Sequence, residues 1–281
     1  NITVKNSVTK KRVEKSINTG SFRTWKPSTV KMNDIKFDKN LFIPMPTGKK
    51  IDNLFSAEGG LMKGTNYAIV GDPGVGKSTV MLDILSDLHK SGKKVLFISG
   101  EMNSIDMHGY VKRYPKFGDL PILFMGDYIE KDPMIILKSI LSEGWDVVLI
   151  DSMAEVTGSI ADFHTGMSGK RAETEVLNLL EKHNKAENKD KINTAFLIIQ
   201  QVTKMGEFAG SNRFKHMMTG MAHMKFMDEG RAFFFSATGL GAAFVLFSSR
   251  TFRGFLSRSA ASATTGAGLM TRLGLFKRGA R

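Results

Sequence analysis

Residues 71–78 read Gly-Asp-Pro-Gly-Val-Gly-Lys-Ser, which satisfies the phosphate-loop pattern G-x-x-x-x-G-K-[ST]. The residues before it, Asn66-Tyr67-Ala68-Ile69-Val70, are typical of a short apolar strand. After it, apolar residues recur at helical spacing before the helix-ending Gly92: Met81, Ile84, Leu85 and Leu88. A strand, a glycine loop and a helix in this order aim backbone N–H groups at a polyphosphate. The stretch therefore predicts a nucleotide-binding site.

Beyond this loop, short apolar runs alternate with helical patterns. The runs typical of buried strands are residues 94–99, 121–125, 146–151 and 194–199. A helix is expected after Asp132, an N-cap residue followed by Pro133, and a second one over residues 169–184. A final pair of strands is expected at 223–227 and 231–236. The alternation predicts an α/β fold, with a mostly parallel, doubly wound sheet flanked by helices.

The net charge of +13 is concentrated at the two ends of the chain. Residues 1–50 hold 12 Lys and Arg against 3 acids, and residues 230–281 hold 8 against none. We therefore expect a basic, irregular N-terminal arm over residues 1–44 and an α/β nucleotide-binding core over 45–241. The remaining residues, 242–281, form a Gly-, Ala-, Ser- and Arg-rich tail that we expect to be poorly packed, apart from an apolar run at 244–247 that predicts an edge strand.

Composition excludes several classes of site. The chain has no cysteine, so it has no disulfide and no thiolate zinc site, and its 6 histidines form no ligand-spaced pair. It shows no signal peptide and no apolar run of about 18 residues, so we expect a cytoplasmic protein without membrane contact.

The basic ends of the chain suit nucleic acid, but solvated tails would have the same composition. In the arm, Phe22 and Trp25 lie among cations, a pattern that suits single strands.

The phosphate loop supplies the candidate residues for binding ATP. They are Gly71, Asp72, Pro73, Gly74, Val75, Gly76, Lys77, Ser78 and Thr79. In such loops the lysine reaches the β- and γ-phosphates, and the serine hydroxyl binds Mg²⁺. ATP and Mg²⁺ are therefore the expected cofactors, with Lys77 as a catalytic residue.

Polar residues at the ends of the other strands complete the candidate site. Asp151 ends an apolar strand, where doubly wound sheets bind their ligands, and is expected to support the Mg²⁺ at Ser78, either as a direct ligand or through another ligand. Glu101 follows the strand 94–99 and is the candidate for the group that deprotonates water. Gln201 is the candidate sensor of the γ-phosphate, and Gln200 is the alternative because adjacent strand residues point to opposite faces.

Three segments together resemble the RecA-like P-loop ATPases: the phosphate loop, Lys-Lys-Val-Leu-Phe-Ile-Ser-Gly-Glu at 93–101, and Val-Val-Leu-Ile-Asp-Ser at 147–152. Residues 201–210, Gln-Val-Thr-Lys-Met-Gly-Glu-Phe-Ala-Gly, are similar to the segment H-V-T-K-x-G-x-x-A-G of the bacterial RadA/Sms recombination proteins. Residues 214–217 fit the L-E-H-M that follows, and residues 47–54 fit the lead-in T-G-x-x-x-L-D-x-x-L loosely. The resemblance covers about residues 45–235.

This resemblance implies ATP hydrolysis by Lys77, Ser78, Glu101 and Asp151. It also implies that Lys204 and its loop contact single-stranded DNA, and the further cations Arg213 and Lys215 in the stretch 203–216 favour the same partner. The family assembles as hexameric rings that drive branch migration during recombination. The expected partners are therefore single-stranded DNA and further copies of the chain.

The chain departs from the RadA pattern in three respects. It has no cysteines for the four-cysteine zinc module, too few residues after 241 for a Lon-protease-like domain, and Ala-Thr-Gly-Leu-Gly at 237–241 where K-N-R-F-G is expected. A shortened relative, such as one encoded by a phage, would account for these differences. With Gln201 in place of the family's histidine, this position resembles RecA itself or a DnaB-type replicative helicase core. The lost basic segment instead favours an ATP-binding switch or assembly protein that does not translocate.

Overall fold

The computed structural model describes residues 29–35, 38–202, 210–227, 230–236 and 243–248. Two units separate along the chain, one over residues 1–38 and one over 39–281. In the described part of the first unit, the regular element is a short 3₁₀ helix, η1 (Met32–Asp34). All the elements named below belong to the second unit.

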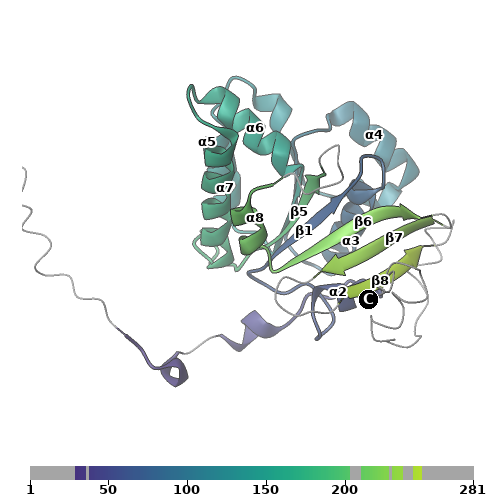
Figure 1. Cartoon of the computed structure of the whole chain (residues 1–281), viewed down its shortest axis with the longest axis vertical. Coiled ribbons are helices and arrows are strands. Elements are labelled where there is room, and N and C mark those ends of the chain that lie inside the picture. The colour runs from purple at the N-terminus through teal and green to yellow at the C-terminus, as the bar shows by residue number, and fades with distance from the viewer. Residues whose placement is uncertain (1–28, 36–37, 203–209, 228–229, 237–242, 249–281) are drawn as a thin grey trace, which may run out of the picture. The chain divides into compact units, whose positions relative to one another are not determined.

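Eight strands form one sheet in the order β3-β2-β4-β5-β1-β6-β7-β8 (Figure 1). Their bounds are β1 Asn66–Gly71, β2 Val95–Ser99, β3 Ile122–Phe124, β4 Val147–Asp151, β5 Ala195–Gln201, β6 Gly220–Met227, β7 Gly230–Ser236 and β8 Ala243–Ser248. The first six in this order pair in parallel, and β7 and β8 are antiparallel additions at one edge. The expectation of a mostly parallel sheet is confirmed. The last strand lies in the range that the sequence assigned to the tail.

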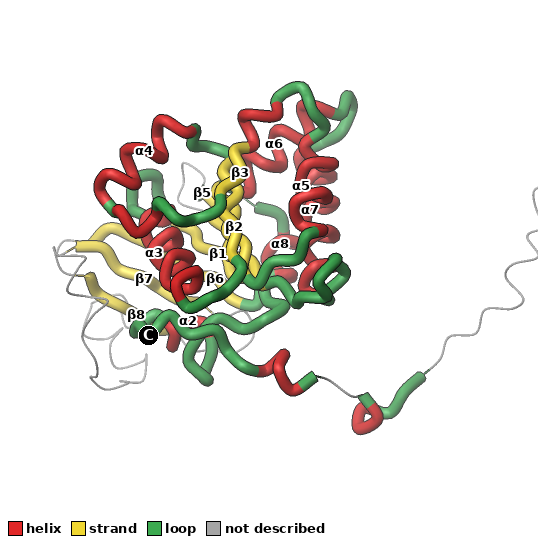
Figure 2. Tube along the Cα trace, turned by 180° about the vertical axis from the view of Figure 1, so that it is seen from behind, coloured by secondary structure: helices red, strands yellow, loops and turns green. Residues whose placement is uncertain are grey.

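Helices cover both faces of the parallel part of the sheet (Figure 2). One face carries α2 (Asp52–Phe55), α3 (Lys77–Lys90) and α4 (Ser104–Arg113), and the other carries α5 (Pro133–Ser142), α6 (Met153–Phe163), α7 (Gly169–Asn184) and α8 (Asn212–Met217). Short 3₁₀ turns complete the unit: η2 (Lys39–Phe42), η3 (Pro115–Phe117) and η4 (Met125–Tyr128). None of the helices within the described ranges is long and apolar enough to cross a membrane.

The strands explain why two separate apolar cores form. Side chains alternate between faces along a strand, so Ile69 packs with α3 while its neighbours Ala68 and Val70 pack on the opposite side. β4 is buried at every residue, as expected for a parallel strand covered on both faces. This continuous burial explains why its sequence shows no alternation.

The helix expectations hold where apolar periodicity is strong. α7 spans the expected residues 169–184, and Asp132 caps α5 by accepting a hydrogen bond from the Met134 N–H (2.8 Å). The sequence did not indicate α4, which has no buried residue and is fixed at its start by a capping box between Asn103 and Asp106. Its inward-facing residues Met107, Tyr110 and Val111 pack against the core but stay only half-buried, so the periodic signal is weak.

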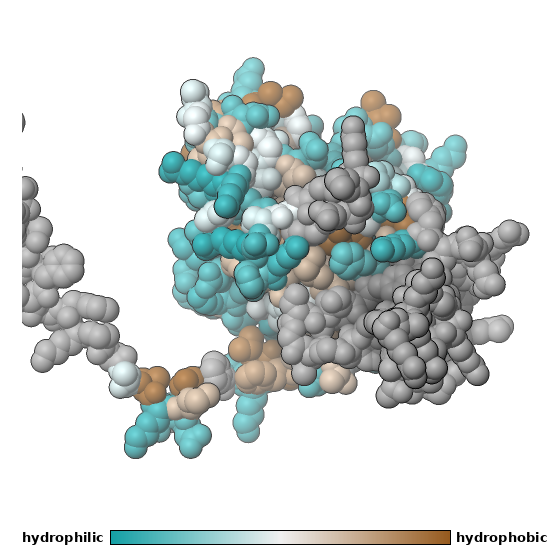
Figure 3. Space-filling view, viewed as in Figure 1, coloured by the Kyte–Doolittle hydropathy of each residue, from teal (hydrophilic) through white to brown (hydrophobic). Residues whose placement is uncertain are grey.

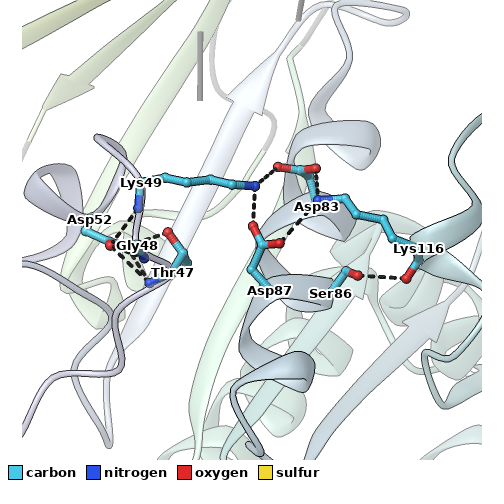
Figure 4. Close-up of polar contacts among 8 residues, drawn as sticks. All are labelled: Thr47, Gly48, Lys49, Asp52, Asp83, Ser86, Asp87 and Lys116. Atoms are coloured by element: carbon cyan, nitrogen blue, oxygen red, sulfur yellow. Dashed lines mark hydrogen bonds and ion pairs between the residues drawn. The ribbon is translucent and has the colours of Figure 1, made fainter. Parts of the chain in front are cut away.

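Four charged side chains connect the segment before β1 to the helix that follows it (Figure 4). Lys49 contacts Asp83 (Nζ–Oδ2 2.5 Å) and Asp87, and Lys116 also contacts both of these carboxylates. The Asp83 side chain is only 8% exposed. Burial lowers the pKa of Lys49, but its contacts with Asp83 and Asp87 outweigh burial and raise it. This charge cluster fixes α3, and therefore the phosphate loop, against two other parts of the chain.

Replacing Asp83 with alanine should lower the free energy of unfolding by about 2–3 kcal/mol, because two partly buried ammonium groups would each lose a partner. The matched control is Glu181→Ala, which removes a solvent-exposed partner of Lys185 on α7 and should leave stability unchanged. Denaturant unfolding of both variants measures the difference. Equal stability of the two variants would show that the charge cluster does not anchor α3.

Candidate active site

The phosphate loop lies between the carboxyl end of β1 and the start of α3. Gly74 and Gly76 have φ angles of +73° and +99°, which L side chains rarely adopt, and a Cβ on Gly74 would meet nothing within 4 Å. Gly71 is constrained differently, because a Cβ there would lie 2.2 Å from the carbonyl oxygen of Met224 on β6. Val75 is fully buried and anchors the loop in the core. The loop is thus held at its base and open at Gly74.

Lys77 begins α3 and folds back over the loop. Its Nζ donates hydrogen bonds to the carbonyl oxygens of Gly71 (2.8 Å) and Asp72 (2.9 Å), and the residue is 7% exposed. Burial lowers the pKa of Lys77, against the opposing effect of the nearby carboxylates of Asp151 and Glu101. The ammonium therefore lies within the loop that the sequence assigned to the phosphates.

Ser78 and Asp151 are brought together, as a shared metal site requires. The Ser78 hydroxyl donates to Asp151 Oδ2 (2.5 Å), and Asp151 is 2% exposed at the end of β4. Burial raises the pKa of the Asp151 carboxyl to about 6; the Ser78 hydrogen bond and Lys77 oppose this shift, and Glu101 adds to it. Two oxygen ligands suited to Mg²⁺ thus lie next to the lysine.

Glu101 and Gln201 also meet at this edge of the sheet. Gln201 Nε2 donates to Glu101 Oε1 at 2.7 Å, although 100 residues separate them in the chain. Gln200, the alternative sensor, is 3% exposed. Adjacent residues of β5 point to opposite faces, so only one of the two glutamines can be beside Glu101. The geometry favours Gln201 at the candidate site.

Sequence reasoning missed the turn that carries Glu101. Ser99 ends β2, and the next residue, Gly100, donates its N–H to the Asp151 carbonyl oxygen (2.7 Å). A Cβ on Gly100 would lie 3.0 Å from the Glu155 Cβ, so close packing favours glycine there. The Ser-Gly pair before the glutamate was the only available signal for a tight turn.

The candidate DNA-binding residues do not all lie at this edge. Lys204 is outside the described residues. Arg213 and Lys215 are exposed on α8, where Arg213 Nη2 donates to Asn178 Oδ1 on α7 (2.6 Å). The end of α8 contacts the start of β1, because the Asn66 side chain donates to the Met217 carbonyl oxygen (3.2 Å).

Since β1 is 6 residues long, the end of α8 at Met217 and the phosphate loop are separated by about 17–20 Å along the strand. The surface over α7 and α8 is largely hydrophilic (Figure 3). Arg213 and Lys215 are exposed on this surface, and the structure pairs Arg213 with α7.

The residues present fit ATP and Mg²⁺. The loop is open at Gly74, a lysine lies inside it, and a helix N-terminus follows it, which together suit a polyphosphate. Ser78 and Asp151 would bind Mg²⁺, which takes its remaining ligands from phosphates and water.

Comparison with known proteins finds relatives of this chain. Relatives include the DNA repair protein RadA of Mycobacterium tuberculosis (28% identical over 184 residues, 65% of this chain and 36% of that protein) and of Campylobacter jejuni (32% over 161 residues, 57% and 33%). The chain matches about a third of the length of these two relatives. Among solved structures, a KaiC-like protein from Pyrococcus horikoshii aligns with a TM-score of 0.49 at 13% identity, over 72% of this chain and 90% of that one.

The RecA N-terminal domain family matches residues 11–232, which include the phosphate loop and every catalytic candidate. This range is well over half of the chain, and the parallel sheet with its phosphate loop at the end of β1 lies within it. The chain is therefore a member of the RecA N-terminal domain family, and it is related to the RadA DNA repair proteins.

Proposed function

We propose that this protein is an ATPase of RadA type that binds single-stranded DNA and couples ATP hydrolysis to movement on DNA or remodelling of it. The observation that supports ATP hydrolysis is the convergence of five side chains from four elements at one edge of the sheet: Lys77, Ser78, Glu101, Asp151 and Gln201. Each comes from the carboxyl end of a parallel strand or the residues that follow one, where doubly wound sheets bind ligands.

The roles of these residues follow from their chemistry. The loop amides and Lys77 hold the phosphates and stabilise the charge that develops on them. Mg²⁺ bound by Ser78 and Asp151 would neutralise further phosphate charge. Glu101 is exposed and is the group that takes a proton from the attacking water. Gln201 holds the Glu101 carboxylate and lies two residues before the stretch 203–216, so it can link the state of the site to that stretch.

The DNA part of the proposal rests on charge and on the relatives. Residues 1–50 carry a large excess of cations, and Lys204, Arg213 and Lys215 follow the catalytic strand β5. The relatives are DNA repair proteins by name. We include in the proposal a homo-oligomeric ring, a hexamer in the RadA family, in which single-stranded DNA contacts these cations.

Replacing Glu101 with glutamine should leave ATP binding unchanged and slow turnover at least about a hundredfold, because the shape is kept and only the basicity is lost. Lys77→Ala should reduce turnover to background and also weaken nucleotide binding. Nucleotide titration and steady-state turnover measure the two effects separately. A Glu101→Gln variant with full turnover would mean that another group activates the water.

Asp151→Asn should stabilise the nucleotide-free protein at pH 8 by about 1–3 kcal/mol. The Asp151 pKa is raised to about 6 from an ordinary value of 3.8, so ionising this buried group costs folding free energy. That cost is absent below the ordinary pKa and grows as pH rises through 6; the asparagine does not incur it. Unfolding without Mg²⁺ at pH 5 and pH 8 should show a smaller difference at pH 5. A difference that is constant with pH would contradict the raised pKa.

Single-stranded DNA should stimulate ATP turnover, and its binding should weaken with salt by about 0.7 log units per decade for each phosphate contacted. Lys204→Ala should reduce both binding and stimulation, and Arg213→Ala should make the salt dependence shallower. Lys138→Ala, which removes an exposed cation on α5, is the control. If DNA does not change the rate of ATP turnover and no salt-dependent binding is found, the alternative of an ATP-binding switch that does not translocate is favoured instead.

A further inference from the structure

One buried hydroxyl closes the turn that carries Glu101. Ser99 is 1% exposed, and its Oγ accepts a hydrogen bond from the Met102 N–H (3.0 Å) and donates one to the Met102 carbonyl oxygen (2.9 Å). Both backbone polar groups of Met102 are thus satisfied by a single side chain three residues earlier. The turn over residues 99–102 is closed by this hydroxyl.

A second contact attaches the same turn to the neighbouring strand. The Gly100 N–H donates to the Asp151 carbonyl oxygen (2.7 Å), and Ser99 pairs with Asp151 in the sheet register. The residues on both sides of Glu101 are therefore held by hydrogen bonds. Gly100 is bonded to the backbone of β4, and Met102 is bonded to the Ser99 hydroxyl. The acceptor for Gly100 is the carbonyl oxygen of Asp151, whose side chain is the candidate ligand for Mg²⁺.

The Glu101 side chain itself is exposed, and packing around it does not hold the carboxylate in place. Within the described residues, the carboxylate accepts a hydrogen bond from Gln201. A long, exposed acid stays in position only if the backbone that carries it is fixed, and displacements of about 1 Å can cost about a hundredfold in rate. The precision of Glu101 thus depends on the turn.

We propose that Ser99 is a positioning residue for the catalytic base: by closing the turn at Met102, its hydroxyl places the Glu101 carboxylate to take a proton from the water that attacks the γ-phosphate. This inference rests on the proposed function, which makes Glu101 the base. Within the part of the chain that the structure describes, the Ser99 hydroxyl bonds to Met102 and not to the phosphate loop. The lysine of that loop, Lys77, is held separately by Gly71 and Asp72. Loss of the Ser99 hydroxyl should therefore affect turnover and spare nucleotide binding.

The test compares Ser99→Ala with Ser86→Ala. Ser86 is equally buried, at 1% exposed, and its hydroxyl donates one hydrogen bond to the Lys116 carbonyl oxygen (2.7 Å), away from the turn. Ser99→Ala should lower kcat about 10- to 100-fold with nucleotide affinity unchanged within about twofold. Ser86→Ala should leave kcat unchanged. Ser99→Thr, which keeps a hydroxyl, should recover most of the lost rate.

A double-mutant cycle separates positioning from a general loss of structure. If Ser99 acts through Glu101, adding Ser99→Ala to Glu101→Gln should reduce kcat no further. Independent, multiplicative losses would overturn the inference, and so would unchanged kcat in Ser99→Ala. If Ser99→Ala does not fold, Ser99→Cys fills the same space with a weaker hydrogen-bonding group and should show the same loss of kcat; full kcat in that variant would also overturn it.

The same measurements distinguish failure of this inference from failure of the proposed function. If Glu101→Gln turns over normally, the base is assigned wrongly and the proposed mechanism fails. If Glu101→Gln is slow while Ser99→Ala is fully active, the mechanism stands and only the positioning role of Ser99 is refuted.

Discussion

The candidate site depends on parallel strand pairing more than on any single side-chain contact. β1, β2, β4 and β5 run in the same direction, so their carboxyl ends meet at one edge and bring together residues up to 130 positions apart, from Gly71 to Gln201. Register decides which groups meet: Ser99 lies opposite Asp151, and Gly71 lies opposite Gln201. A shift of one residue in either pair would turn the Asp151 or Gln201 side chain to the other face of the sheet.

Hydrogen bonds among the functional groups then hold the site in one arrangement. Lys77 is held by its own loop, Ser78 by Asp151, and Glu101 by Gln201. Incoming phosphates and Mg²⁺ would have to compete with these contacts. Burial raises the pKa of Asp151, so the charged form of this carboxylate is unfavourable without a cation beside it. Such shifts are common at functional sites.

Much of this arrangement could be predicted from the sequence, because a few residues carry strong local information. The phosphate loop fixes the positions of Lys77 and Ser78, and the apolar run before Asp151 indicates the end of a buried strand. The sequence could not show which of Gln200 and Gln201 faces Glu101, because β5 is apolar on both faces and has no alternating pattern. It also missed the charge cluster and the attachment of the Ser99 turn to β4, since both depend on contacts between distant segments. Likewise, the sequence could not show where Arg213 lies, because its position depends on how the chain runs from β5 through α8 to β6.

The charge cluster of Lys49, Asp83, Asp87 and Lys116 has a consequence for experiments in which ionic strength is varied. Its carboxylates are only 8% and 18% exposed, so dissolved ions screen these pairs much less than they screen charges in open water. Contacts between surface lysines and DNA phosphates are fully open to such screening and to counterion release. The anchoring of α3 should therefore persist at salt concentrations that would release DNA under the proposed function, and a change in DNA affinity with salt would then report on the proposed DNA contacts rather than on the fold.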